Sequence, residues 1–307
     1  MKPTLSNTNY LAGFETYLLA EKRVAQNTFL AYQKDIEQFI QFLQEEKVGL
    51  ADVSKETFKK YLKVLKQQGL TARSVSRKIS ALKLLYSFLE ERFQITNNAQ
   101  YLASPKIEKT LPIYLTPEEV ERLFKVANRD ESPRGVRNKV MLSLLYASGV
   151  RISELLSLTV DNINFNTGFI QVSGKGNKER SIPLPGNVVS LLRHFLDTTY
   201  KEFFPPHKQP VPPYLFVSSV DGSQATPLSR QSLWGLIKKL IVKAQINKNI
   251  SPHSLRHSLA THLLKNGADL RSLQLLLGHE NLATVQIYTH VETSELRKIY
   301  DKKHPRA

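Results

Sequence analysis

The 307-residue sequence contains no cysteine. This absence excludes disulfide bonds, thiolate metal sites and a cysteine nucleophile, and it is in keeping with a reducing compartment. The sequence also lacks any run of roughly 18 or more apolar residues, so it predicts no membrane-spanning helix. It has no charged-then-apolar leader of the kind that directs secretion, no internal repeat and no low-complexity segment. We therefore expect a cytoplasmic protein that does not enter a membrane.

The composition is strongly basic. The chain has 43 Lys and Arg residues against 27 Asp and Glu residues, which leaves a net charge of +16. Such an excess predicts a polyanionic partner, and nucleic acid is the leading candidate. A solvated basic surface would explain the charge equally well if the charge were the only evidence. The motifs of the last quarter of the chain favour nucleic acid.

The first hundred residues have the periodicity of helices. Apolar residues recur at three- and four-residue spacing from Thr28, a second helix follows Ser54 as its N-cap, and a third starts near Thr71. The third helix has an apolar stripe and a separate polar one, in which short hydroxyl side chains alternate with arginines. That pattern suits contacts with phosphate groups. The residues predicted to bind DNA are Arg73, Ser76, Arg77 and Ser80.

A charged segment bracketed by prolines interrupts the helical pattern. It predicts a linker at residues 105–112, between a helical domain at residues 1–104 and a second domain at residues 113–307. Thr116 and Pro117 then have the residue types of an N-cap and a first helical position. The second domain therefore begins with a helix, and the length of the chain suffices for two domains that each bury a core.

The second domain is predicted to be mainly helical around a small antiparallel β-meander. Strand-forming segments separated by turn residues lie between Ile163 and Leu184. Lys175 falls in the turn between the second and third segments, and Pro183 predicts that the third strand lies at an edge. The expected fold class is mainly α with this one meander.

The last quarter of the chain carries its most specific pattern. His253, Arg256, His279 and Tyr288 fall close together in the sequence, and Ser251 begins a helix just before the first two. A helix N-terminus attracts phosphate, and we expect this helix to present His253 and Arg256 on one basic face. Gly278 permits a sharp turn that would place His279 in a loop near Tyr288.

Two further basic residues complete the set. Arg151 follows Gly149, and Lys175 lies in its predicted turn. Cations and imidazoles beside a phenol suit phosphoryl transfer on a nucleic acid backbone. Each part taken alone has a simpler interpretation, because single buried Arg or His residues are usually structural, His253 and His257 could ligate zinc, and the helices could form a helix-turn-helix that only binds DNA. None of these interpretations accounts for the whole set.

These segments resemble the tyrosine recombinase (phage integrase) family, and within it the Xer-type members. The matching motifs occur in the family's order and are Gly149-Val-Arg151-Ile-Ser-Glu154-Leu155, Gly174-Lys175-Gly176, His253-Ser-Leu-Arg256-His257, Leu277-Gly-His279 and Tyr288-Thr-His290. No catalytic position is missing, and the resemblance extends over nearly the full chain. It implies a helical, SAM-like core-binding domain followed by an α+β catalytic domain.

The resemblance also implies the chemistry. Tyr288 would attack a DNA phosphodiester and form a 3′-phosphotyrosyl bond, and Glu154 would orient the pocket. No metal, cofactor or ATP is expected. The catalytic residues that the resemblance implies are Arg151, Lys175, His253, Arg256, His279 and Tyr288.

The partners implied are double-stranded DNA with two inverted half-sites and three further protomers, either identical or from a paralogous recombinase. A DNA translocase is a further expected partner. The expected role is resolution of chromosome or plasmid dimers, with mobile-element or phage integration as the alternative. A type IB topoisomerase-like enzyme and a non-catalytic DNA-binding protein are weaker alternatives. The terminal helix around Leu296, Ile299 and Tyr300 is expected to dock into a neighbouring protomer, or otherwise to fold back on its own domain.

Overall fold

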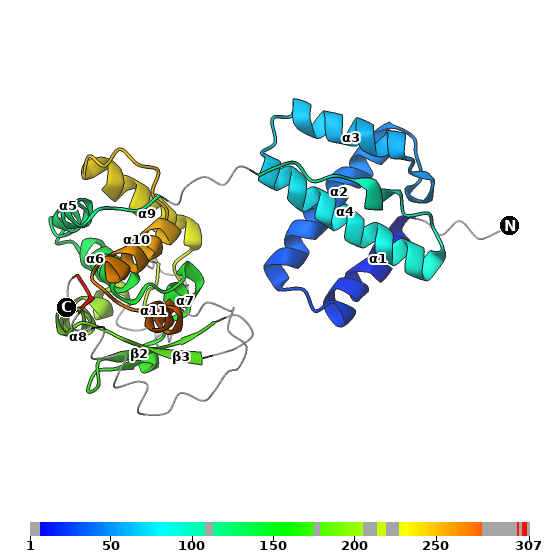
Figure 1. Ribbon diagram of the computed structural model, residues 1–307. Coiled ribbons are helices and arrows are strands. Elements are labelled where there is room, and N and C mark those ends of the chain that lie inside the picture. The colour runs from blue at the N-terminus through cyan, green and yellow to red at the C-terminus, as the bar shows by residue number, and fades with distance from the viewer. Residues whose placement is uncertain are drawn as a thin grey trace. The chain divides into compact units, whose positions relative to one another are not determined.

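The computed structural model describes residues 7–107, 113–174, 179–204, 214–218, 227–277, 300 and 303–305. The chain divides into two compact units, residues 1–110 and residues 111–307, each with its own hydrophobic core (Figure 1). Within the described ranges no helix is long and apolar enough to cross a membrane. The predicted fold class, mainly helical with one small antiparallel sheet, is confirmed.

The first unit is helical throughout its described part. Its α-helices are α1 (Asn7–Thr16), α2 (Gln26–Glu45), α3 (Lys55–Gln67) and α4 (Ala72–Phe93), with short helical turns at Tyr17–Glu21, Leu50–Asp52 and Asn98–Tyr101. The predicted N-cap Ser54 is confirmed, because its side chain accepts a hydrogen bond from the backbone N–H of Thr57. The third helix starts at Ala72, as predicted, and Thr71 caps it by accepting from the backbone N–H of Ser74. Helix α1 was not predicted.

Aromatic side chains fill the core of this unit. Phe39 stacks on Phe58 with ring centroids 5.6 Å apart, and Tyr61 meets the Phe39 ring edge-on at 4.9 Å. The buried hydroxyl of Tyr86 donates to the carbonyl of Leu50 at 2.9 Å. Since α2, α3 and α4 all contribute rings, the core holds α4 and its polar stripe in a defined orientation.

The second unit surrounds a buried helix. Its α-helices are α5 (Pro117–Ala127), α6 (Pro133–Ser148), α7 (Ile152–Ser157), α8 (Gly186–His194), α9 (Arg230–Lys243), α10 (Pro252–Lys265) and α11 (Leu270–Leu277). Helix α6 packs against α5, α7, α8 and α10 and is almost completely buried over its second half. The predicted caps Thr116, before α5, and Ser251, before α10, are confirmed.

Gly149 ends α6 and turns the chain into α7. Its φ of +59° lies in the left-handed region that favours glycine. A Cβ atom here would lie 2.7 Å from Cδ2 of Leu277 and 3.0 Å from Cδ2 of Leu259. Both conditions favour glycine here, since a larger residue would strain the backbone and displace the two leucine side chains. The turn sets where Arg151 begins the next helix.

The sheet has the predicted order of three antiparallel strands, β1 (Ile163–Asn164), β2 (Phe169–Ser173) and β3 (Glu179–Pro183). Ile170 pairs with Ile182, and both side chains face the core. Strand β3 lies at the edge, as Pro183 predicted. Ser173 pairs with Glu179, so the described ends of the two strands on either side of Lys175 lie side by side. Lys175 itself lies outside the described residues.

Candidate active site

Three arginines from distant parts of the sequence converge in the second unit. Arg151 is the N-cap of α7, Arg180 lies on β3 and Arg256 lies on α10. The side chain of Arg151 is 33% exposed, whereas that of Arg180 is 7% exposed and Arg256 is 8% exposed. Arg151 is therefore the arginine of this group that reaches the surface.

Glu154 connects two of these arginines. Its carboxylate accepts hydrogen bonds from the backbone N–H of Arg151 at 2.7 Å and from Nη1 of Arg151 at 2.8 Å. Nη1 and Nη2 of Arg180 donate to its two oxygens at 2.9 and 2.8 Å, a bidentate contact. Burial opposes the charge on Glu154, but the hydrogen bonds from Arg180 and Arg151 outweigh it and lower its pKa to about 2. Glu154 is therefore a carboxylate at neutral pH.

Arg256 corrects one expectation. It was predicted to stand on an exposed basic face of α10, but it is buried, and its guanidinium donates to the carbonyls of Gly149, at 2.6 Å, and of Leu277. The last carbonyls of a helix lack partners within it and carry partial negative charge, which explains why the end of α11 attracts this cation. Burial, together with the charges of Arg151 and Arg180, lowers the pKa of Arg256 to about 10, so the side chain stays charged at neutral pH.

His253 does lie on the exposed side of α10, one residue after Pro252, whereas His257 is half-buried. The Ser251 hydroxyl caps this end of the helix by accepting from the backbone N–H of Ser254 at 3.2 Å. The first turn of α10 thus places an imidazole at the positive end of a helix dipole. In the described parts of the chain, no three His, Asp or Glu side chains gather as a metal site would require.

The charges of the site sum to an anion-binding region. Three arginine cations against the single carboxylate of Glu154 leave a net charge of +2 on these four side chains. Because little water reaches the buried members, this charge acts on an anion at Arg151 with less screening than a surface cluster would. The arrangement suits an oxyanion that contacts the exposed part of Arg151.

Three of the predicted catalytic residues, Lys175, His279 and Tyr288, lie outside the described residues. Helix α11 ends at Leu277, two residues before His279, and Arg256 holds its last carbonyl. The structure therefore brings together Arg151, Glu154 and Arg256. It also shows where the chain leaves α11, directly before the segment that contains His279 and Tyr288.

Arg180 was not predicted. Its signal in the sequence is its phase in β3: it stands two positions before Ile182, in the inward-facing register, where an apolar residue is expected. A charged residue at such a position needs a buried partner of opposite charge. Glu154 is that partner, and it lies 26 residues earlier in the chain.

In the first unit, the predicted DNA-binding residues lie on α4. Arg73, Arg77 and Ser80 are exposed and Ser76 is half-buried. Arg77 donates to the buried carboxylate of Asp35 at 2.6 Å while its side chain remains 43% exposed. Asp35 therefore ties Arg77 to α2 and restricts the position of its guanidinium.

Of the predicted terminal helix, Leu296 and Ile299 lie outside the described residues. The C-terminal residues that the structure does describe pack against their own domain. Tyr300 is buried, and its hydroxyl donates to the carbonyl of Ala147 at 2.7 Å. Its ring stacks on His304 with centroids 4.7 Å apart. The end of α6 provides the acceptor for the Tyr300 hydroxyl and, through Tyr146, a ring that contacts His304, which explains this placement.

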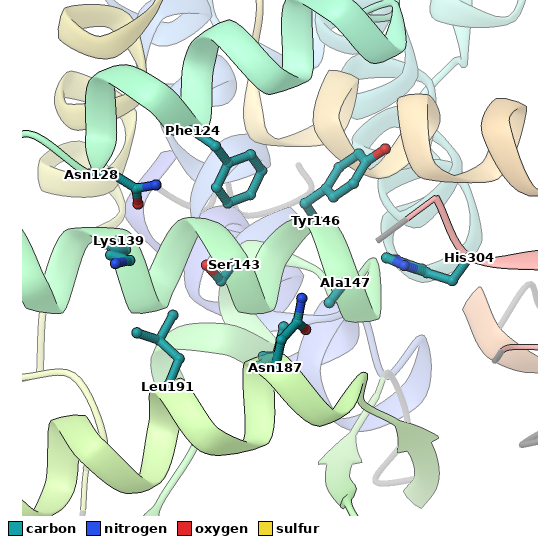
Figure 2. A pocket seen from close by; sticks show the side chains of 10 residues that line it. Phe124, Asn128, Lys139, Ser143, Tyr146, Ala147, Asn187, Leu191 and His304 are labelled. Carbon is teal, nitrogen blue, oxygen red and sulfur yellow. The ribbon is translucent and has the colours of Figure 1, made fainter. Parts of the chain in front are cut away.

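His304 also borders a cavity of about 250 Å³ between α5, α6 and α8. Figure 2 shows Phe124, Tyr146 and His304 at its wall. The Tyr146 and His304 rings meet edge-on with centroids 5.9 Å apart. None of the predicted catalytic residues that the structure describes, Arg151, His253 and Arg256, lines this cavity.

Known proteins match both units. The family model described as "Phage integrase family" matches residues 114–295, and the model "Phage integrase, N-terminal SAM-like domain" matches residues 11–92. The chain is 38% identical over 293 residues to tyrosine recombinase XerD of Staphylococcus haemolyticus, covering 95% of this chain and 97% of that protein. It is 39% identical over the same length to tyrosine recombinase XerD of Staphylococcus aureus strain Mu50, with the same coverage.

Among solved structures, XerH recombinase bound to palindromic difH substrate in a post-cleavage complex has a TM-score of 0.68 at 22% identity. The match covers 97% of this chain and 90% of that one, and it shows the same fold. The chain therefore belongs to the phage integrase family, the tyrosine recombinases. The predicted resemblance is confirmed, and with it the enzyme class: site-specific recombinases that cleave and rejoin DNA without metal or ATP. Neither a topoisomerase nor a non-catalytic DNA-binding protein fits this similarity as well.

Proposed function

We propose that this protein is a cytoplasmic Xer recombinase that resolves chromosome or plasmid dimers. Its substrate is double-stranded DNA with two inverted half-sites, and it works as a homotetramer or as a tetramer with a paralogous recombinase. The observation that carries the proposal is 38–39% identity to XerD over 95% of the chain. The net charge of +16 supports a DNA substrate.

The proposed reaction is a reversible exchange of phosphate esters. The Tyr288 oxygen attacks the scissile phosphorus, the P–O5′ bond breaks, and a 3′-phosphotyrosyl bond forms beside a free 5′-hydroxyl. His253 accepts the phenolic proton and Lys175 donates a proton to the departing O5′. Attack by a 5′-hydroxyl on the phosphotyrosine reverses each step, so the bond energy is conserved and ATP is not consumed.

Arg151 and Arg256 would stabilise the negative charge on the nonbridging oxygens in the transition state, with His253 and His279 as further donors. The geometry supports different roles for the two arginines. Arg151 reaches the surface and is oriented by Glu154 through both its backbone and its guanidinium. Arg256 donates two of its five guanidinium N–H groups to the carbonyls of Gly149 and Leu277. The other three are the donors that would bind the nonbridging oxygens.

In the first unit, we propose that Arg73, Ser76, Arg77 and Ser80 contact the DNA backbone. Arg73 and Arg77 are exposed on α4, and Asp35 restrains Arg77. A restrained guanidinium loses less conformational entropy on binding a phosphate than a free one. Residues 105–112, between the two domains, would act as the linker that lets them bind one duplex together.

Recovery of bound DNA tests the substrate. We expect the tagged protein, crosslinked in its host, to enrich one short sequence made of two inverted half-sites, and a plasmid with two copies of it to be resolved in vitro. A Tyr288→Phe variant provides the matched control, because it should enrich the same sequence without resolving the plasmid. Enrichment of many unrelated sequences, with relaxation of any supercoiled plasmid, would instead indicate a topoisomerase.

The proposed acid, Lys175, makes a separate prediction. Lys175→Ala should cleave normal DNA about 100-fold more slowly or worse, the usual contribution of a positioned acid. It should cleave nearly at the wild-type rate when the departing 5′-oxygen is replaced by sulfur, because a thiolate leaves without a proton. Single-turnover cleavage of both substrates measures this. An equal defect on the two substrates would show that Lys175 binds DNA and does not act as the acid.

A further inference from the structure

We propose that Arg180 is a positioning residue of the active site, which holds Glu154 and the end of α11 in one geometry. It would thereby set both the orientation of Arg151 and the start of the segment that carries His279. This inference rests on the catalytic roles proposed above for Arg151 and His279.

The guanidinium of Arg180 uses all three of its nitrogens. Nη1 and Nη2 donate to the two oxygens of Glu154 at 2.9 and 2.8 Å, and Nε donates to the carbonyl of Leu276 at 3.3 Å. The group is planar, so these three directions are set together. A change in the position of Arg180 would shift Glu154 and Leu276 at once.

Glu154 transmits this position to Arg151. Each carboxylate oxygen that binds Arg180 also accepts from Arg151: Oε1 from Nη1, and Oε2 from the backbone N–H. Arg180 therefore holds Glu154 from the buried side while Glu154 holds Arg151 toward the surface. Without Arg180, the Glu154 carboxylate, which is 3% exposed, would keep Arg151 as its one cationic partner among the residues that the structure describes.

The second connection reaches the end of α11. Arg180 and Arg256 bind two consecutive carbonyls, those of Leu276 and Leu277. These carbonyls belong to the last turn, whose C=O groups have no N–H donors within the helix. The two arginines thus anchor the end of α11 to β3 and to α10, directly before the segment with His279.

Stability alone does not account for this arrangement. The neighbouring inward positions of the sheet are occupied by Ile170, Val172 and Ile182, which bury apolar surface. A buried ion pair is often no more stabilising than apolar residues of similar volume, because both charges must be desolvated. What an apolar residue could not supply is the directed contact with Glu154 and Leu276.

The test is a double-mutant cycle on the rate of adduct formation, measured in single turnover with a duplex nicked near the scissile phosphate. Arg180→Gln is combined with Glu154→Gln, and each variant is measured across pH. We expect Arg180→Gln to slow cleavage about 10- to 100-fold, the cost of misplaced catalytic groups. In the Glu154→Gln background, the same change should cost much less, since the group through which Arg180 acts is already altered. Gel shifts on the same four proteins set the protein concentration at which the duplex is saturated, so that the rates compare cleavage and not binding.

The pH profile separates positioning from a structural role. Burial raises the pKa of Glu154, and Arg180 and Arg151 lower it. Loss of Arg180 should therefore raise this pKa, so Glu154 would gain its proton at a higher pH and cleavage would fall earlier on acidification. The charged groups that face Glu154 from the elements packed around it are Arg151, Arg180 and Arg256. The added acid sensitivity should vanish in the Glu154→Gln background, because the group that gains the proton is then absent.

Arg137→Gln is the matched control. Arg137 is equally buried, at 8% exposed, but it donates to the carbonyl of Val217 and to Asn138, away from Glu154. It should lower the melting temperature without changing the acid limb. If Arg180→Gln does not fold, Arg180→Lys replaces it in the double-mutant cycle with Glu154→Gln. An ammonium group keeps the positive charge but cannot make all three contacts of the guanidinium. Additive effects with Glu154→Gln, or an unchanged acid limb, would overturn the inference. Absence of an adduct with the wild-type protein would instead refute the proposed function.

Discussion

Tyr288→Phe is expected to abolish strand cleavage and to leave duplex binding nearly unchanged. The substitution removes the one oxygen that forms the phosphotyrosyl bond and no positive charge, while binding depends on a chain with a net charge of +16. A duplex nicked near the scissile phosphate loses a short fragment after cleavage, which prevents rejoining and traps the covalent adduct. Denaturing gels then report the adduct, and gel shifts report binding.

Tyr300→Phe is the appropriate control for that experiment. It also removes a phenolic hydroxyl, but from a buried tyrosine whose hydroxyl donates to the carbonyl of Ala147. We expect it to form the adduct normally and to lose about 1 kcal/mol of unfolding free energy, the typical contribution of a hydrogen bond. The wild-type adduct should also form in excess chelator. An adduct with Tyr288→Phe would show that another residue is the nucleophile.

Arg256→Ala should have the second largest effect, because it removes a group to which we assign a catalytic role in addition to its two contacts with buried carbonyls. Loss of a donor to the transition-state oxygens is expected to slow cleavage about 100- to 1,000-fold. The same change leaves the buried carbonyls of Gly149 and Leu277 without their arginine partner, at a cost of about 1–3 kcal/mol for each carbonyl. Single-turnover cleavage and urea unfolding, measured on the same preparations, resolve the two effects.

Arg137→Ala separates stability from catalysis in this case. It also removes a buried arginine bound to a backbone carbonyl, that of Val217. At a temperature where both variants are folded, Arg137→Ala should cleave at nearly the wild-type rate. If the two variants lost cleavage in proportion to their stability, Arg256 would be a structural residue only.

Both units contain a buried carboxylate that binds two basic side chains. In the first unit, Asp35 of α2 binds Arg77 and Lys78 of α4 at 2.6 and 2.8 Å and leaves Arg77 partly exposed. In the second unit, Glu154 does the same for Arg151 and Arg180. In both places a buried carboxylate orients one exposed cation and one buried cation. The shared arrangement preorganises the cation that faces solvent.

The sequence alone determined those features of the fold that depend on residues close together in the chain. Ser54, Thr116 and Ser251 cap helices because a hydroxyl reaches the backbone only three residues ahead, and Pro183 lies on an edge strand because it lacks an N–H to donate. The order of the catalytic motifs was equally local, so Arg151 and Arg256 could be assigned to one family and to one reaction.

Only the tertiary structure decided which charges meet. Arg180 reaches Leu276 across 96 residues and Arg256 reaches Gly149 across 107 residues, distances over which no periodicity predicts a contact. The periodicity of α10 placed Arg256 with His253, yet the partly negative end of α11 draws its guanidinium inward. Tyr300 likewise lies against its own α6, where the carbonyl of Ala147 is available to it. These outcomes depend on where unpaired carbonyls and buried carboxylates come to lie after folding, which is a property of the packed chain and not of any one segment.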